Sequence, residues 1–171
     1  MNRSFVVVAG VAAIGLTLVL STQTSGSAQL GTSTKLNANA KMTTAANRMQ
    51  PHRLAVQVDV NDPATMNLAL NNVSNTAQHY NQIGQKVEIE VVAFGPGLHM
   101  LRDDTSPVKA RIKSMSETMP ALTFSACGNT RENMAKFEAK DIPLISQAKV
   151  TKSGVVRLME LQERGWSYLR P

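Results

Sequence analysis

Cys127 is the single cysteine of this 171-residue chain, and its place in the sequence favours chemistry. It ends the short apolar run ALTFSA (residues 121–126) and precedes Gly128-Asn129-Thr130, where we expect a helix to begin. Free backbone N–H groups and the helix dipole at such an N-terminus favour an anion, and the thiolate is the nucleophilic form of cysteine. Position alone leaves two interpretations open: a reactive thiol, or a buried cysteine that packs as a small hydrophobic residue.

His99 is the second candidate, because it follows a Gly-Pro-Gly turn and could act as an acid or base beside Cys127. The alternative is a loop or first-turn histidine that faces solvent or caps a neighbouring segment. Asp62 is most simply the N-cap of a helix, with a functional carboxylate as its alternative. The residues that we expect to shape a pocket around Cys127 are Gly95, Pro96, Gly97, Gly128, Asn129 and Asp62.

Other common kinds of site lack their motifs. One cysteine excludes an intrachain disulfide framework and a Cys-based zinc cage, and the three scattered histidines have no metal-binding spacing. The patterns GxxxxGK[ST], GxGxxG and GxSxG do not occur, so nucleotide-dependent chemistry and a hydrolase have no support. The nine methionines fit helix core positions better than a copper site. We therefore expect neither a metal nor another cofactor.

The net charge of +6 comes mainly from the first fifty residues. No acidic residue precedes Pro51, whereas four basic residues do: Arg3, Lys35, Lys41 and Arg48. Four of the six excess positive charges therefore lie before Pro51, and the remainder of the chain is nearly neutral. This distribution does not favour a nucleic-acid partner, in spite of a pI of about 9.8.

The first segment has the layout of a secretory signal peptide. Arg3 precedes an uncharged apolar stretch (5–20), and the small residues Gly26-Ser27-Ala28 follow it. We expect cleavage after Ala28, a signal peptide over residues 1–28, and a periplasmic or secreted protein. The alternative is an uncleaved anchor, the only case in which we expect contact with a membrane. Residues 29–50 lack aromatic residues, Val and Ile, which predicts a flexible tether before a domain over residues 51–171.

The domain alternates between predicted strands and helices. Strands are expected over residues 53–60, 86–94, 121–126, 145–150 and 166–169. Helices are expected to begin at Asp62-Pro63, at Ser106-Pro107, at Asn129 with Glu132 as a capping box, and at Ser153. This alternation predicts a single α/β domain with a mostly parallel sheet. In such a fold, the loops 61–63, 95–99 and 127–130 lie at the carboxyl edge of the sheet, where ligands bind.

From about Arg53 to Pro171 the chain resembles the DsrE/DsrF-like family with the YchN-type fold, and most closely its small exported members. The segments that carry the resemblance are NDPATMNLALNNV, VEIEVVAFGPGLHMLRDD, FSACGNT and GVVRLMELQERGWSYLRP, in this order. The resemblance implies a mainly parallel five-stranded sheet with helices on both faces. It also implies homo-oligomers, typically homotrimers or homohexamers, with clefts between the subunits.

In sulfur-relay members of this family, a cysteine in the loop after a central strand carries sulfur as a persulfide, and Cys127 lies in the corresponding loop. The resemblance therefore implies an exported sulfur carrier or sulfurtransferase-like protein, with a sulfur donor or acceptor protein as its partner. Two alternatives stay open. One is a non-catalytic oligomeric module that holds a small ligand or redox partner while Cys127 is structural. The other is a redox or metal-handling accessory protein that uses Cys127 and His99 across a subunit interface.

Overall fold

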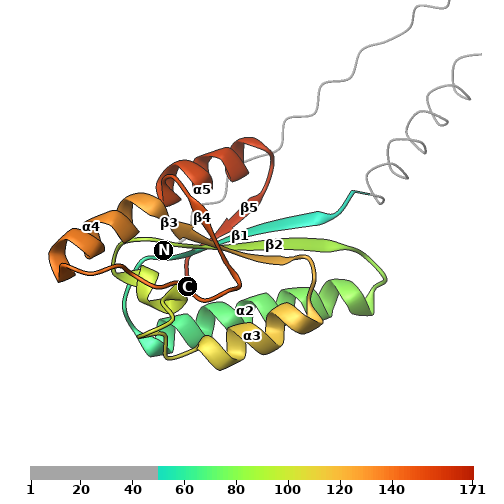
Figure 1. The fold of residues 1–171 in the computed structure, drawn as a ribbon. Helices are drawn as coiled ribbons and strands as arrows, with labels where there is room; N and C mark the ends of the chain where they lie inside the picture. Colours follow the sequence, from blue (N-terminus) through green and yellow to red (C-terminus); the bar gives the residue numbers. More distant parts are fainter. Residues whose placement is uncertain (1–49) are drawn as a thin grey trace, which may run out of the picture. The chain divides into compact units, whose positions relative to one another are not determined.

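Five strands pair in parallel to form the sheet of the computed structural model, which describes residues 50–171 (Figure 1). The strands are β1 (His52–Val58), β2 (Val87–Ala93), β3 (Leu122–Cys127), β4 (Ala148–Thr151) and β5 (Ser167–Leu169), in the order β4-β3-β2-β1-β5. Every neighbouring pair of these strands is parallel. The predicted signal peptide, and the predicted tether apart from residue 50, lie outside the described residues.

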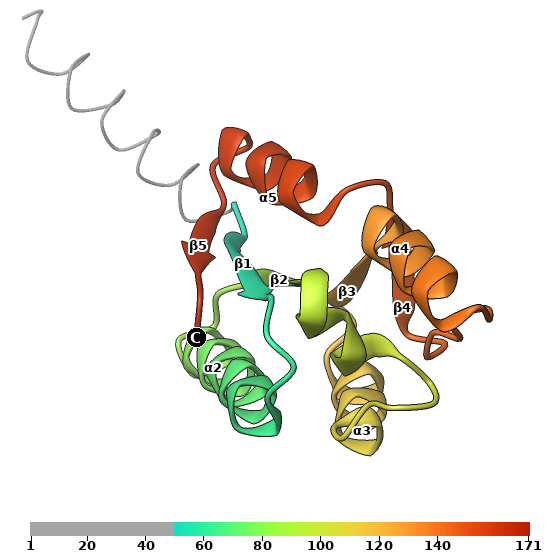
Figure 2. The same cartoon turned by 90° about the vertical axis from the view of Figure 1, so that its left-hand side faces the viewer.

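Helices cover both faces of the sheet, as predicted (Figure 2). They are α2 (Pro63–Gln82), the 3-10 helix η1 (Gly95–Leu101), α3 (Lys109–Thr118), α4 (Gly128–Glu138) and α5 (Gly154–Glu163). Both views show α2 and α3 on one face, and α5 and α4 on the other side. The chain is therefore a single α/β domain over the described residues, and the predicted fold class is confirmed.

The two faces of the sheet differ in polarity. Along β3, Phe124 and Ala126 belong to the larger apolar cluster, which packs against α2 and α3. Because side chains alternate along a strand, Ser125 and Cys127 face the opposite side, toward α5. The apolar cluster on that side is small and consists of Ala55, Val92, Leu158 and Leu161. The face that carries Cys127 therefore combines a thin apolar layer with polar side chains.

Local signals predict α2 correctly. Asp62 caps it, and its side chain accepts hydrogen bonds from the N–H groups of Ala64 and Thr65. Met66 and Leu70 of the predicted apolar stripe are fully buried. The helix therefore begins and packs where the cap and the 3.6-residue spacing place it.

Three predicted boundaries are wrong. The residues after Gly95 form η1 rather than a loop. The helix expected at Ser106 begins at Lys109, because the Ser106 hydroxyl donates to the Met100 carbonyl (2.6 Å) across a turn. The strand expected from Ile145 begins only at Ala148, because the Ile145 N–H donates to the Leu101 carbonyl (3.0 Å) and so joins η1. In the last two cases, a contact with η1 keeps the segment out of the predicted element.

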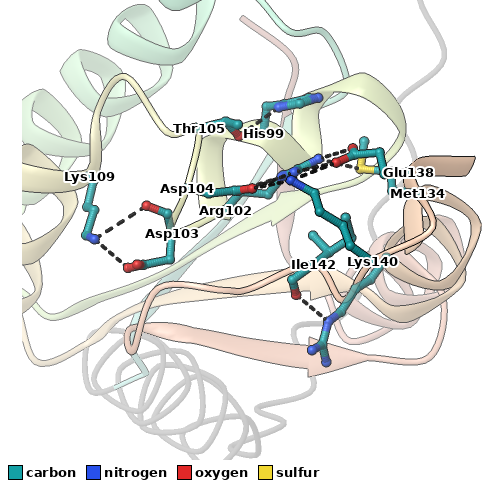
Figure 3. A network of polar contacts seen from close by, with 11 residues as sticks. His99, Arg102, Asp103, Asp104, Thr105, Lys109, Met134, Glu138, Lys140 and Ile142 are labelled. Carbon is teal, nitrogen blue, oxygen red and sulfur yellow. Dashed lines mark hydrogen bonds and ion pairs between the residues drawn. The ribbon is translucent and has the colours of Figure 1, made fainter. Parts of the chain in front are cut away.

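Arg102 joins the end of η1 to the end of α4 (Figure 3). Its side chain is 1% exposed, and its guanidinium donates to both carboxylate oxygens of Asp104 (2.9 and 2.8 Å) and to both of Glu138. Lys140 Nζ lies 3.2 Å from Asp104 Oδ2 and 3.3 Å from Glu138 Oε2. The network therefore contains two positive and two negative side chains. This network fixes the distance between two elements that frame the candidate site.

The same hydrogen bonds shift the ionisation of the acidic partners. Bonds from Arg102, and then from Lys140, hold the pKa of Asp104 well below its ordinary value. They also lower the pKa of Glu138 from 4.5 to about 2. The stabilisation that Glu138 contributes through its ionised form is therefore complete above pH 4.5, and it is lost as the pH falls to about 2.

Replacing Arg102 by methionine should lower the free energy of unfolding on the order of 3 kcal/mol at neutral pH, because two carboxylates lose their shared buried cation. The variant should also lose less stability than the wild type on acidification. Urea unfolding at several pH values measures both effects, and Lys140→Met, which removes the exposed cation, is the matched control. A variant as stable and as acid-sensitive as the wild type would contradict the role of this network.

Candidate functional site

Cys127 is the last residue of β3 and also the N-cap of α4. Its Sγ accepts a hydrogen bond from the Thr130 N–H at 3.4 Å. The predicted capping box of Asn129 and Glu132 is therefore wrong, because the helix begins at Gly128. The Asn129 N–H instead donates to the Lys152 carbonyl (3.1 Å), which ties the start of α4 to the segment before α5.

A second helix begins beside Cys127. The register of the sheet pairs Cys127 with Thr151 of β4, and Ser153 caps α5 directly afterwards. Gly154, the first residue of α5, lies so close to the Phe94 side chain that a Cβ there would be 2.9 Å from the Cβ and Cδ1 atoms of Phe94. The N-termini of α4 and α5 therefore meet at the end of β3, the strand that carries the sulfur. The positive end of each helix dipole favours an anion at this place.

The hydrogen bonds around Cys127 favour its thiolate. Burial raises the pKa of the Cys127 thiol, but the Thr130 hydroxyl and the backbone N–H groups of Gly154 and Thr130 outweigh it and bring the pKa below its ordinary value. The Cys127 residue is only 5% exposed. The sulfur is therefore buried, and the groups that stabilise its thiolate are neutral hydrogen-bond donors.

Thr130 links Cys127 to the Gly-Pro-Gly segment. Its Oγ1 accepts a hydrogen bond from the Gly95 N–H at 3.0 Å, which leaves its own proton to donate to the Cys127 sulfur. Sequence reasoning missed Thr130. The signal that could have found it is the spacing Cys-x-x-Thr at a helix start, which places threonine at the third helical position, where the N-cap side chain accepts its hydrogen bond.

A pocket of about 420 Å³ lies on the other side of Thr130. Its lining comes from the segment before α2, from η1 and from α4, and consists of Asn61, Gly95, Pro96, His99, Thr130, Asn133, Met134 and Phe137. Cys127 does not line this pocket, whereas Thr130 lines it and also donates its N–H to the Cys127 sulfur, so Thr130 connects the two places. The lining contains no Asp, Glu, Lys or Arg, which suits an uncharged, partly apolar ligand group.

The structure brings some of the predicted site residues together and separates others. Gly95, Pro96 and His99 line the pocket. His99 Nδ1 lies 2.8 Å from Thr105 Oγ1, above Arg102 in Figure 3, rather than at the Cys127 sulfur. His99 therefore stands at the pocket wall, where it can exchange a proton with a ligand and not directly with the thiol.

The remaining predicted residues have structural places. A Cβ on Gly97 would lie 2.3 Å from the Val58 carbonyl, so this glycine lets η1 pack on the end of β1. Gly128 opens α4, and Asn129 is exposed. The Asp62 carboxylate is engaged as an N-cap, and its hydrogen bonds from Thr65 lower its pKa. The preceding Asn61 lines the pocket in its place.

Two further findings concern residues 50–171. This part of the chain contains no group of three or more His, Cys, Asp or Glu side chains that could hold a metal ion. Among its helices, none combines the length and the apolar character that crossing a membrane requires.

Replacing Thr130 by valine should raise the pKa of the Cys127 thiol, because the sulfur loses its hydroxyl donor. The expected result is a several-fold slower reaction of the folded protein with iodoacetamide at neutral pH, with a rate profile displaced to higher pH. The matched control is Thr123→Val. Thr123 lies on β3 and on the same face of the sheet as Cys127, and its replacement should leave the profile unchanged. Equal profiles for both variants would show that Thr130 does not stabilise the thiolate.

Comparison with known proteins supports the fold. No protein-family model and no curated protein matches the chain. Among solved structures, the chain is similar to a protein of unknown function, MTH1491, from Methanobacterium thermoautotrophicum, with 29% sequence identity. The match covers 70% of this chain and 99% of that protein, with a TM-score of 0.60. The chain therefore shares its α/β fold with a solved structure to which no function is assigned.

Proposed function

We propose that this protein is an exported, DsrE-like sulfur carrier, in which Cys127 accepts sulfur as a persulfide. The observation that carries the proposal is the set of neutral donors that the starts of α4 and α5 supply to the Cys127 sulfur. A thiol with a lowered pKa is more ionised near neutral pH, and the thiolate is the form that attacks a sulfur atom. The resemblance in sequence to the DsrE/DsrF-like family supports the same assignment.

The proposed chemistry is two displacements at sulfur. With thiosulfate as the donor, the Cys127 thiolate attacks the outer sulfur, a new S–S bond forms, and sulfite leaves with the electron pair of the broken bond. The thiolate of an acceptor then attacks the outer sulfur of the persulfide, and Cys127 leaves as the thiolate. The hydrogen bonds from Thr130 and Gly154 that stabilise the thiolate also make it a better leaving group. The two steps need no further oxidant or reductant.

The pocket beside Thr130 does not include Cys127, so its proposed role is to hold the part of the donor or acceptor that adjoins the reacting sulfur, and not that sulfur itself. Phe137, which is 91% exposed, and Met134 give it apolar walls, while Asn61 and Asn133 offer amide hydrogen bonds. His99 can protonate a leaving group or take a proton from an incoming thiol there. Because this lining contains no Asp, Glu, Lys or Arg, it suits an uncharged part of a donor or acceptor molecule, and small anions such as thiosulfate need not occupy it to react with Cys127.

Treating the purified protein with thiosulfate or polysulfide should add the mass of one sulfur atom, as seen by intact mass spectrometry. Dithiothreitol should remove the added mass, and Cys127→Ser should never acquire it. Alkylation of the untreated folded protein with iodoacetamide is the accompanying measurement of accessibility. If no donor produces an adduct while the folded thiol also resists alkylation, the carrier proposal is wrong.

A second candidate is a non-catalytic oligomeric binding module, and the burial of Cys127 favours it. Several apolar side chains on β4 and α5 are at least half exposed, namely Val150, Val155, Val156 and Met159. Apolar groups that cluster on a surface commonly mark a contact between proteins. We propose that this surface packs against further copies of the chain in a homotrimer or homohexamer, whichever of the two functions holds.

The oligomer predicts a mass several times that of one chain in light scattering. Met159→Lys on α5 should reduce this mass, because a charge would then enter the contact. Leu68→Lys on α2 is the matched control, since Leu68 is 47% exposed but belongs to another face. A monomeric wild-type protein would contradict the assembly and would leave the result on sulfur uptake standing.

A further inference from the structure

Glu90 is a buried carboxylate on the face of the sheet that α5 covers. It is 4% exposed, and Arg157 of α5 donates a hydrogen bond to each of its two oxygens, from Nε at 2.7 Å and from Nη2 at 2.8 Å. The Ser125 hydroxyl donates to the same carboxylate at 2.6 Å. Burial raises the pKa of Glu90, but the bonds from Arg157 and Ser125 outweigh it and keep the pKa below its ordinary value. Glu90 is therefore ionised and fully engaged.

Stability alone does not explain a charged pair at this place. The neighbouring cluster is apolar, with Val92 and Leu158 among its members, and well-packed apolar side chains are often as stabilising as a buried ion pair. What an Arg–carboxylate pair adds is geometry, because two parallel hydrogen bonds fix both distance and orientation. A pair of this kind suits a place where the orientation of α5 on the sheet matters.

The pair connects the two elements that meet at the sulfur. Ser125 precedes Cys127 by two residues and shares its face of β3, so the Glu90 carboxylate is tied to the strand that carries the thiol. Arg157 lies one turn after Gly154, whose N–H helps to stabilise the thiolate. The carboxylate on β2 therefore holds the strand of the nucleophile and the first turns of the donor helix at once.

We propose that Glu90 and Arg157 are positioning residues, which orient the start of α5 so that the Gly154 N–H reaches the Cys127 sulfur. The inference rests on the proposed role of Cys127 as the reacting thiol. Three other charged groups border this arrangement. Lys149 of β4 acts on Glu90 through its charge, Glu160 binds Arg157 Nη1 (3.2 Å), and Arg131 of α4 donates to the Ile142 carbonyl (2.9 Å).

The test is the pH profile of iodoacetamide alkylation of Cys127 in two conservative variants of the full chain. Arg157→Lys keeps the positive charge but loses the bidentate hydrogen bond to Glu90. Glu90→Gln removes a negative charge near the thiol. Positioning predicts that both variants react several-fold more slowly at neutral pH, with profiles displaced to higher pH. An effect of charge alone predicts no change for Arg157→Lys, and faster reaction for Glu90→Gln because a nearby negative charge is gone.

A second ion pair on the same face supplies matched controls. Arg53 and Glu88 lie on β1 and β2, 3.2 Å apart, and Glu88 is two residues from Glu90. Arg53→Lys and Glu88→Gln repeat the two substitutions without touching α5, and should leave the profile unchanged. Circular dichroism confirms that each variant is folded, and because either test variant suffices, loss of one to misfolding leaves the other decisive.

The positioning role would be overturned if the folded Arg157→Lys variant had the same alkylation profile as the wild type. It would also be overturned if the folded Glu90→Gln variant reacted faster than the wild type. Slower alkylation in both, with unchanged controls, supports it. The measurement does not depend on sulfur transfer. If the wild type takes up no sulfur, the proposed function fails, while the alkylation profiles still show whether the ion pair sets the state of the thiol.

Discussion

The stabilisation of one buried sulfur by backbone and hydroxyl donors is the constraint on which the arrangement of this domain depends. The donors come from the starts of two helices, and these starts can meet at Cys127 only because β3 and β4 are parallel neighbours. A parallel sheet places the carboxyl ends of its strands at one edge, and each following helix begins there. The register that pairs Cys127 with Thr151 thus brings the start of α5 to the start of α4.

The unequal faces of the sheet follow from the same requirement. The thick apolar cluster against α2 and α3 supplies most of the buried hydrophobic surface, and with it most of the stability of the domain. The opposite face can therefore carry charged and polar side chains, and these groups fix the orientation of the helices that pack there. Glu90 with Arg157 fixes α5, and Arg102 with Glu138 fixes the far end of α4. Each helix that begins at the sulfur is thus held by an ion pair with an arginine: α5 through its own half-buried Arg157, and α4 through the buried Arg102 of the segment after η1.

Local signals made the strands, α2 and the place of Cys127 predictable. An N-cap such as Asp62, a glycine at positive φ such as Gly84 or Gly165, and an alternating run of Val each act within a few residues. What sequence reasoning missed is nonlocal. Arg157 and Glu90 lie 67 residues apart, and Arg102 and Glu138 lie 36 apart, so no spacing in the sequence reveals either pair. The separation of His99 from Cys127 was equally hidden, because only the fold shows that His99 lines the pocket and Cys127 does not.

The identity of the residue at the N-cap bears on function. Capping alone favours Ser, Thr, Asp or Asn, whose oxygens accept the hydrogen bond from the third helical residue better than sulfur does. Packing alone favours alanine or valine, which would leave the Thr130 N–H without its acceptor. Cysteine is the weaker choice on either ground. Its advantage over serine is ionisation: the serine hydroxyl stays neutral, whereas the same donors shift a thiol toward its nucleophilic anion. The cap and the proposed chemical role therefore use one set of hydrogen bonds, and the proposed role accounts for sulfur as the acceptor.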